Sequence, residues 1–376
     1  MRENHRRLQF ERRRNETSRV TPLNRQLPRM LIFRFPLLAD KWATRLVVAF
    51  WAITFAFGCA HAQSEFEIIG AAGDCLPNKC VEYGRSKDRA CEACLGLQEI
   101  WIVDATGCPE ICELESGFRA LRFIRCRGDS KCAVSYESFI ANMNGPLSTS
   151  VYVHGYSPGK MVDEADALEL AQAASHAAPF RLVIWQWKIE HRLLQGLKSN
   201  VVENMDRAER QGYYIAKIAS RIRNQTALAL VGHSFGSISV CAALHSLAVE
   251  QSGHESSNNL STDSNRPIQT VLIAPAIGSE SLLPSGRFSL ATTQVDRMLI
   301  TYNPRDRSLN AQAKITGNGN ILGLTGMRGQ KLLTINGNSI TQMDVSSHLG
   351  GIHWLYRMLQ ESSTRRCIGA FVVANP

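Results

Sequence analysis

The feature that most constrains the fold is the stretch 227–236, which reads Ala-Leu-Ala-Leu-Val-Gly-His-Ser-Phe-Gly. An apolar run ends at Gly232, Ser234 follows, and residues 237–249 are long and apolar enough for a helix. This order predicts a strand, a sharp turn at the serine and a helix. Side chains two positions before and after such a serine would collide with neighbouring elements, and glycine at 232 and 236 removes both clashes. The serine oxygen would then stand beside free N–H groups at a helix start, where negative charge is stabilised.

Strand and helix patterns alternate on both sides of this turn. The alternation predicts an α/β fold, with a mostly parallel sheet covered by helices on both faces. Residues 120–126 are expected to pair antiparallel to 99–105, and the irregular segment 279–295 is expected to contribute to a lid. The expected strands are 99–105, 120–126, 149–153, 181–187, 227–231, 270–274, 297–302 and 331–335, and the expected helices are 136–143, 163–177, 206–223, 237–249 and 353–360.

Two motifs carry a resemblance to a known family. They are Gly232-His233-Ser234-Phe235-Gly236 and Val151-Tyr152-Val153-His154-Gly155-Tyr156. With them the chain resembles the α/β-hydrolase superfamily, in its branch of serine esterases and lipases and as an exported bacterial member. The resemblance covers roughly residues 98–360. It implies an α/β-hydrolase domain over 96–365 followed by a tail at 366–376, with catalytic groups in the order serine, acid, histidine at the carboxyl ends of strands.

Ser234 is the candidate nucleophile, and a serine at neutral pH needs an adjacent base oriented by an acid. Asp306 is the candidate acid, because it follows the strand 297–302 in a Pro-containing turn. The alternative is that Asp306 only caps its own backbone. Asp344 is a weaker candidate, and Asp296 precedes the strand and so lies at the wrong end.

Two histidines near the end of the chain are candidates for the base. His348 stands in a Ser/Gly segment, and the resemblance implies a catalytic histidine in the loop before the last helix. His348 is therefore the preferred base, and His353, at the expected start of that helix, is the second candidate. His154 and His233 stand beside their glycines and are candidates to support the catalytic groups from behind.

Backbone N–H groups are expected to stabilise the oxyanion of the tetrahedral intermediate. One donor is the N–H of Phe235, which follows the serine. By resemblance, the second is the N–H of Tyr156 in the loop after the strand 149–153. A single glycine precedes Tyr156, so a narrow site is expected that disfavours bulky alcohol groups. This chemistry requires neither a metal ion nor an organic cofactor.

The charge of the chain is concentrated at its front. The net charge is +9, but residues 1–45 hold eleven Arg and one Lys against four acidic residues. The remainder is near neutral, which argues against a nucleic-acid-binding surface on the globular part.

An apolar run at 46–60 follows these basic residues and precedes Ala60-His61-Ala62. It predicts a secretory signal cut after Ala62, so that 1–62 forms a basic leader with a signal and the mature protein is periplasmic or extracellular. Three alternatives stay open: an uncleaved membrane anchor at 46–60, a lipoprotein site at Cys59, and a true start at Met30.

The cysteines favour export as well. Eight of the eleven cluster behind the signal, which predicts disulfides in a Cys-rich extension at 63–95 and in the first part of the domain. A zinc site built from the pairs 91/94 and 108/112 is the alternative. The clustered cysteines are Cys75, Cys80, Cys91, Cys94, Cys108, Cys112, Cys126 and Cys132.

Taken together, these features predict an exported serine hydrolase that cleaves an ester or thioester through an acyl-enzyme on Ser234. Its substrate would be a small-molecule or lipid-like ester, and residues 46–60 could associate it with a membrane. The alternative from another class is a non-catalytic protein of the same fold, a binding module at the cell surface whose Cys-rich front makes the contacts. Neither the acyl length nor the oligomeric state is indicated by the sequence.

Overall fold

The computed structural model describes residues 96–108, 114–128, 130–143, 145–156, 160–174, 178–190, 196–223, 226–254, 268–327, 332–335 and 338–374. Ten strands form one sheet in the order β3-β2-β1-β5-β4-β6-β7-β8-β10-β9. The seven strands from β1 to β10 in that order are parallel, and β2, β3 and β9 pair antiparallel at the two edges. The strands are β1 (Leu97–Asp104), β2 (Arg122–Arg127), β3 (Ser130–Val134), β4 (Ser148–Val153), β5 (Phe180–Gln186), β6 (Leu228–His233), β7 (Ile268–Ile273), β8 (Val295–Tyr302), β9 (Leu332–Ile335) and β10 (Asn338–Asp344).

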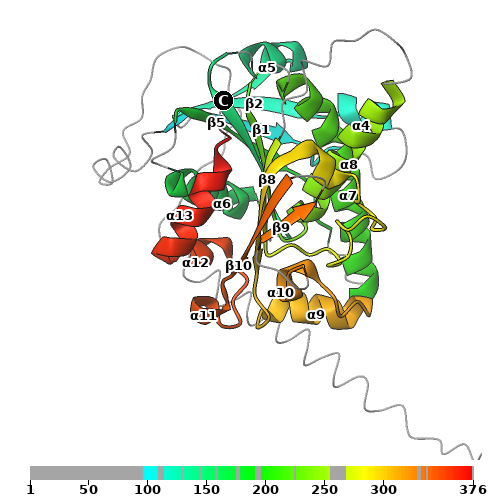
Figure 1. Cartoon of the computed structure of the whole chain (residues 1–376). Coiled ribbons are helices and arrows are strands. Elements are labelled where there is room, and N and C mark those ends of the chain that lie inside the picture. Colours follow the sequence, from blue (N-terminus) through cyan, green and yellow to red (C-terminus); the bar gives the residue numbers. More distant parts are fainter. Residues whose placement is uncertain are drawn as a thin grey trace, which may run out of the picture. The chain divides into compact units, whose positions relative to one another are not determined.

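Helices cover both faces of this sheet (Figure 1). On one face α7 packs against α8, and α8 lies against β6 and β4. On the other face α13 packs on β6, β7 and β8 and contacts α6 and α12. The helices are α4 (Leu114–Arg119), α5 (Tyr136–Met143), α6 (Lys160–Ala173), α7 (Leu197–Arg223), α8 (Gly236–His254), α9 (Arg307–Thr316), α10 (Leu322–Thr325), α11 (Ser346–Leu349), α12 (Leu355–Gln360) and α13 (Ser362–Val372), with a 3₁₀ turn at Ala291–Gln294.

The central strands are buried along their whole length. Every residue of β4, β5, β6 and β7 is buried, as expected for parallel strands that are covered on both faces. The predicted α/β class, the mostly parallel sheet and the antiparallel pairing of β2 with β1 are confirmed.

Several elements differ from the expectation. The last expected helix begins at Leu355 rather than at residue 353, and His348 lies inside the short helix α11 rather than in an open loop. The expected tail at 366–376 is largely helix α13, whose Ile368 and Phe371 are buried. Strands β3 and β10 were not predicted. The segment 279–290 forms turns, as its irregular sequence indicates, and its role as a lid stays a prediction.

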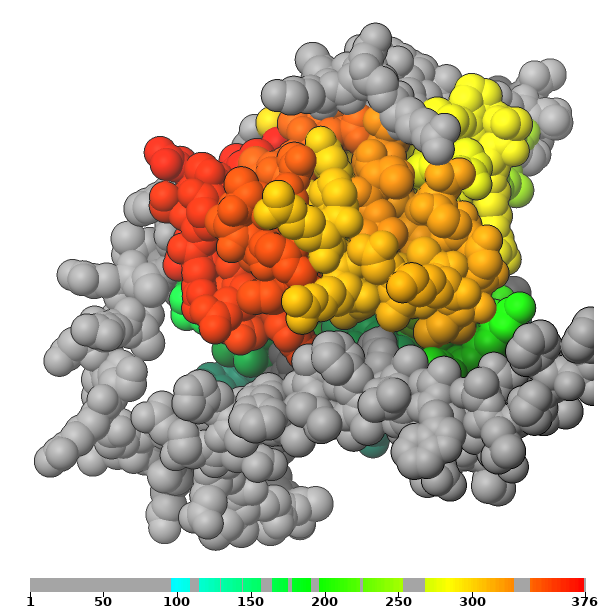
Figure 2. Space-filling model, turned by 90° about the horizontal axis from the view of Figure 1, so that it is seen from below, coloured from blue at the N-terminus to red at the C-terminus, as the bar shows by residue number. Residues whose placement is uncertain are grey.

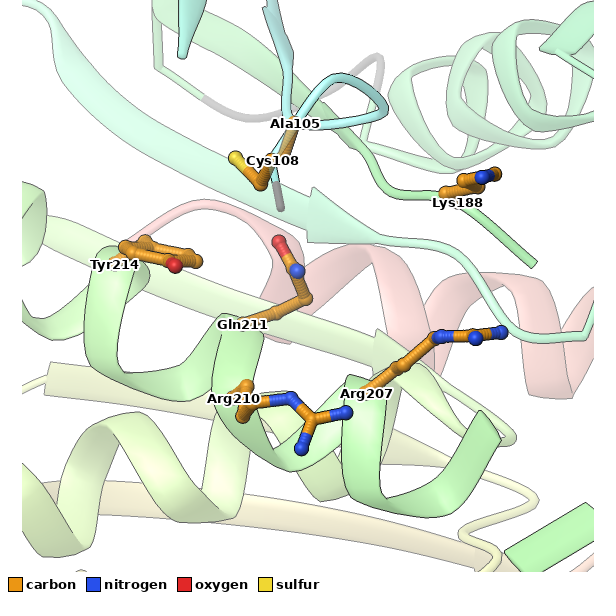
Figure 3. A pocket seen from close by; sticks show the side chains of 7 residues that line it. All are labelled: Ala105, Cys108, Lys188, Arg207, Arg210, Gln211 and Tyr214. Atoms are coloured by element: carbon orange, nitrogen blue, oxygen red, sulfur yellow. The ribbon is translucent and has the colours of Figure 1, made fainter. Parts of the chain in front are cut away.

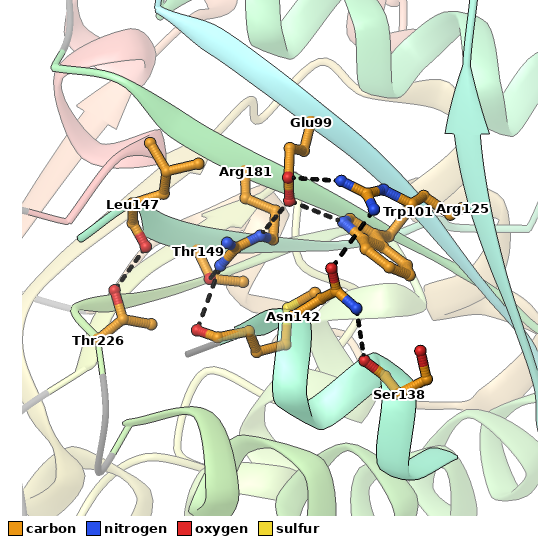
Figure 4. A network of polar contacts seen from close by, with 10 residues as sticks. Glu99, Trp101, Arg125, Ser138, Asn142, Leu147, Thr149, Arg181 and Thr226 are labelled. Carbon is orange, nitrogen blue, oxygen red and sulfur yellow. Dashed lines mark hydrogen bonds and ion pairs between the residues drawn. The ribbon is translucent and has the colours of Figure 1, made fainter. Parts of the chain in front are cut away.

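A network of polar contacts ties four strands together near the start of β5 (Figure 4). Glu99 on β1 accepts hydrogen bonds from Arg181 Nε at 2.8 Å, from an Arg125 guanidinium N–H at 2.9 Å and from Trp101 Nε1 at 3.2 Å. Arg181 is buried and also donates to Thr149 Oγ1 on β4 at 3.2 Å. Because a buried charge is costly unless it is paired, these contacts fix the order β2-β1-β5-β4 at this end of the sheet.

The predictions for the front of the chain lie outside the described residues, including the signal or anchor at 46–60 and the extension at 63–95. Within the described part, no disulfide joins the five cysteines to one another: Cys108, Cys126, Cys132, Cys241 and Cys367. Disulfides among the other clustered cysteines stay a prediction. Among the described helices, none has the length and apolar character needed to cross a membrane.

Candidate active site

Ser234 occupies the sharp turn between β6 and α8. Its φ is +52°, one of two positive values among the described non-glycine residues, so the backbone is strained where the sequence predicts a strained turn. The turn is held on both sides: the Ser234 N–H donates to the Ile273 carbonyl at 2.9 Å, and the Ser234 carbonyl accepts from Ser237 N–H at 3.1 Å and Ala276 N–H at 3.2 Å. Ser234 is 5% exposed. The serine is thus rigidly fixed at the carboxyl end of the central strand.

The two glycines around Ser234 are required by close approach of the backbone. A Cβ at Gly236 would lie 2.0 Å from the Val153 carbonyl oxygen of β4. A Cβ at Gly232 would lie 2.7 Å from the backbone N and Cα of Ser237. Both partners are main-chain atoms that cannot move aside, which accounts for the glycines of the motif as the sequence predicts.

Asp306 and His353 form a buried acid–histidine pair. Asp306 Oδ2 lies 2.6 Å from His353 Nδ1, and the Asp306 side chain is fully buried while that of His353 is 15% exposed. The other oxygen, Oδ1, accepts from the Leu309 N–H at 3.0 Å and caps the start of α9. Asp306 therefore contacts a histidine through one carboxylate oxygen and caps its own backbone through the other.

Backbone contacts join the turn that carries Asp306 to the loop that carries His353. Asn303 Nδ2 donates to the Gly350 carbonyl at 3.0 Å, and the Arg307 N–H donates to the Gly351 carbonyl at 3.2 Å. Figure 2 looks onto this end of the molecule, where the orange segment with α9 and α10 and the red segment from α11 onward lie side by side. The spacing between Asp306 and His353 is thus set by hydrogen bonds to the carbonyls of Gly350 and Gly351.

The structure does not bring His348 to Asp306, in contrast to the sequence expectation. His348 is exposed on α11, where its Nε2 lies 3.3 Å from Thr364 Oγ1 and its Nδ1 lies 3.4 Å from Ser347 Oγ. His353, the second candidate, takes the place beside the acid. The physical reason is the helix boundary: α12 starts at Leu355, so His353 rather than His348 lies in the loop immediately before it.

The remaining acidic candidates lie elsewhere. Asp344 is exposed, and its carboxylate accepts from the Ser346 N–H at 2.8 Å. Asp296 is exposed near the start of β8, as its position in the sequence indicated.

His233 connects the nucleophile's turn to His353. The ring centroids of His233 and His353 are 5.1 Å apart with the planes tilted by 31°, and His233 Nε2 lies 3.3 Å from the His353 carbonyl oxygen. Since His233 directly precedes Ser234, these contacts bring His353 against the turn that carries the serine. The sequence marked His233 only as a supporting group, and its contact with His353 had no sequence signal.

The loop after β4 lies against Ser234. A Cβ at Gly155 would come 2.7 Å from Ser234 Cβ, so only glycine fits there. His154 Nδ1 donates to the Gly155 carbonyl at 2.7 Å, while its Nε2 accepts the Trp187 N–H at 3.2 Å. Burial lowers the pKa of His154 to about 4, so the ring stays neutral with its proton on Nδ1.

Trp187 completes the support of this loop. Its indole N–H donates to the His154 carbonyl at 3.0 Å, and its ring stacks on the His154 ring with centroids 5.4 Å apart. The Tyr156 N–H belongs to the same trans peptide as the Gly155 carbonyl and points the opposite way. Holding that carbonyl against His154 therefore fixes the direction of the Tyr156 N–H. The Tyr156 ring packs edge-on against Phe235, with centroids 5.8 Å apart.

A separate pocket lies at the carboxyl ends of β1 and β5, over α7 (Figure 3). Three cationic side chains line it, but Glu190 pairs with two of them, Arg207 at 2.8 Å and Lys188 at 2.5 Å. Glu190 therefore offsets one of the three positive charges. Ser234 is not among the lining residues, which are Ala105, Cys108, Lys188, Arg207, Arg210, Gln211 and Tyr214.

Comparison with known proteins identifies the family of the chain. Residues 143–351 match the model of a family described as an alpha/beta hydrolase of unknown function (DUF900). No curated protein matches the chain. Among solved structures, it is similar to a crystal structure of C6-C4 SN3 inhibited esterase B from Lactobacillus rhamnosis, at 13% identity and a TM-score of 0.31, over 72% of this chain and 86% of that one.

Proposed function

Because this chain belongs to the alpha/beta hydrolase family of unknown function (DUF900), we propose that it is a serine hydrolase that cleaves an ester or thioester. Ser234 is the proposed nucleophile, His353 the base and Asp306 the acid that orients it. The observation that carries the proposal is the 2.6 Å contact between Asp306 and His353, whose ring also packs against His233, the residue before Ser234.

Each residue has a defined part in the proposed reaction. A carboxylate beside Nδ1 keeps the proton of the neutral ring on that nitrogen and leaves Nε2 of His353 as the base. His353 takes the Ser234 proton as the oxygen attacks the carbonyl carbon, and Asp306 stabilises the resulting imidazolium. The imidazolium then gives the proton to the leaving alcohol or thiol, and water repeats the sequence to release the acid.

Backbone amides are proposed to stabilise the tetrahedral intermediate. The candidates remain the N–H groups of Phe235 and Tyr156. The contacts from His154 and Trp187 support the assignment of Tyr156, because they fix its peptide plane before substrate binds. The low exposure of Ser234 and the close approach of Gly155 support a preference for esters of unbranched alcohols.

The direct test is labelling with a fluorophosphonate probe together with hydrolysis of p-nitrophenyl esters. We expect the wild-type chain to be labelled and active, and Ser234→Ala to lose both. Ser347→Ala is the matched control, since Ser347 is exposed and lies beside His348 rather than at the turn. Equal labelling of Ser234→Ala and wild type would contradict the proposed nucleophile. Folded wild-type protein with neither labelling nor hydrolysis would favour the binding module.

Export stays a proposal that rests on the sequence of residues 1–62. N-terminal sequencing of the protein produced in a bacterial host tests it. A mature chain that begins after Ala62 supports a cleaved signal, and an intact chain in the membrane fraction supports the anchor.

A further inference from the structure

His233 makes two contacts with the proposed base that the triad does not require. Its ring centroid lies 5.1 Å from that of His353, and its Nε2 lies 3.3 Å from the His353 carbonyl oxygen. A carbonyl oxygen can only accept, so Nε2 of His233 carries a proton and donates it to this bond. His233 therefore makes a hydrogen bond to the backbone of His353 with its Nε2–H, and the face of its ring lies against the ring of His353.

His233 remains uncharged in the pH range where a serine hydrolase works. The residue is 7% exposed. Burial, and next the charge of His353, lower the pKa of His233 to about 3. The ring that faces His353 is therefore a neutral aromatic surface and not a second cation.

From this geometry we propose that His233 is a positioning residue whose ring stabilises the protonated form of His353, while its ring N–H holds the loop before α12. The inference rests on the proposed function and deepens it. A cation within about 6 Å of an aromatic centroid is attracted by the ring quadrupole. During the reaction His353 becomes a cation when it takes the Ser234 proton, so the contact is stronger in the transition state than with the neutral ring.

Three titratable groups face His353 from the surrounding elements. Asp306 comes from the turn after β8, His233 from the end of β6 and Asp166 from α6. Burial, and next the charge of Glu169, raise the pKa of Asp166 to about 7. Asp166 therefore changes charge in the same pH range as an imidazole, and its effect has to be separated with Asp166→Asn.

The test is the pH profile of kcat/KM for a p-nitrophenyl ester between pH 5 and 9, measured in wild type and in three His233 variants, each also with Asp166→Asn. His233→Phe keeps an aromatic face without the donor, His233→Gln keeps a donor without the face, and His233→Leu has neither. Phe and Leu are both apolar and compatible with burial. The difference between the pH midpoints of these two variants therefore measures the effect of the aromatic face alone. Thermal unfolding of each variant measures any general loss of structure.

The face favours the proton on His353, so its loss should move the midpoint of the acidic limb to lower pH. We expect a shift of about half to one pH unit in His233→Leu and His233→Gln, with kcat reduced about 3- to 10-fold and KM unchanged. In His233→Phe the midpoint should stay at the wild-type value. A purely structural role would lower activity in all three variants without moving the midpoint.

Equal midpoints in the Phe and Leu variants would overturn the inference. Hydrolysis that depends on Ser234 but has the same acidic limb in all variants would overturn this inference alone and leave the proposed function standing. Absence of Ser234-dependent hydrolysis in wild type would overturn the proposed function and this inference with it.

Discussion

Asp306 and His353 are 47 residues apart in the chain, and their side chains meet at 2.6 Å between Oδ2 and Nδ1. Main-chain contacts from the turn of Asp306 to the loop of His353 surround this pair, including the hydrogen bond from the Arg307 N–H to the Gly351 carbonyl. The acid and the base therefore belong to one rigid unit built from two segments of the chain.

The two histidines of the last segment should differ sharply in their importance. We expect His353→Ala to lower kcat about 10⁴-fold, because a serine without its base is a weak nucleophile. His348→Ala should retain near wild-type activity, since His348 contacts Thr364 and Ser347 and not the acid. Ester hydrolysis by the two purified variants decides between them. The reverse ranking would restore His348 as the base and remove the significance of the Asp306 contact.

Two substitutions at Asp306 should separate its contact with His353 from its role as the N-cap of α9. Asparagine caps a helix about as well as aspartate but cannot stabilise an imidazolium, so Asp306→Asn should lose about 10⁴-fold in kcat with little change in unfolding temperature. Asp306→Ala should lose the same activity. It should also lower the free energy of unfolding by about 1 kcal/mol, because the Leu309 N–H loses its capping acceptor. Kinetics and thermal unfolding are measured on both proteins. Full activity of the asparagine variant would show that Asp306 is only a cap.

Gly236 should tolerate no side chain. A Cβ there would lie 2.0 Å from the Val153 carbonyl oxygen, and relief requires β4 and α8 to separate. We expect Gly236→Ala to cost about 3 kcal/mol or more in the free energy of unfolding. Gly319→Ala is the matched control, because no atom lies within 4 Å of its Cβ position, and it should change stability by less than about 0.5 kcal/mol. Urea unfolding of the two variants compares them, and equal stability would disprove the close approach.

The buried histidines should make the fold sensitive to acid. The folded-state pKa of His154 is lowered to about 4 by burial from an ordinary value of 6.5. Between these two pH values the unfolded chain binds a proton that the folded chain does not, so stability falls as the pH decreases below 6.5. For His154 alone the loss approaches about 3 kcal/mol by pH 4.

Urea unfolding at pH 7.5 and pH 4.5 measures this loss. His154→Gln should have a smaller difference between the two conditions than wild type, and His348→Gln, at an exposed position, should match wild type. An identical difference in all three proteins would mean that His154 takes up its proton equally well in the folded state.

The sequence was most informative where a steric requirement left few choices. The Gly-x-Ser-x-Gly turn, the buried parallel strands and the acid after β8 were all predicted because close packing or strand ends demand those residue types. The close approach of Gly155 to the serine, in contrast, was found only in the structure.

The expectation that His348 would lie beside Asp306 failed at a helix boundary. Whether His348 or His353 lies in the last loop depends on whether α12 begins at residue 353 or 355, and local propensity does not resolve two residues. The contact between Asp306 and His353 depends instead on Asn303 and Arg307, which make hydrogen bonds to a loop more than forty residues later in the sequence. Helix α13 was not predicted because its sequence mixes polar and apolar residues. The helix is stabilised by packing its buried face against the sheet, and local sequence does not indicate that contact.

The position of α13 has a consequence for the way the protein reaches its working shape. This helix packs on β6, β7 and β8, and the carbonyls of Ala370 and Val373 accept hydrogen bonds from Gln269 on β7. Helix α13 thus covers the strand that leads to Ser234, although more than a hundred residues separate the two in the sequence. The sheet stays uncovered on this side until α13 has docked, so a folding intermediate without α13 would present an apolar sheet face to chaperones and proteases.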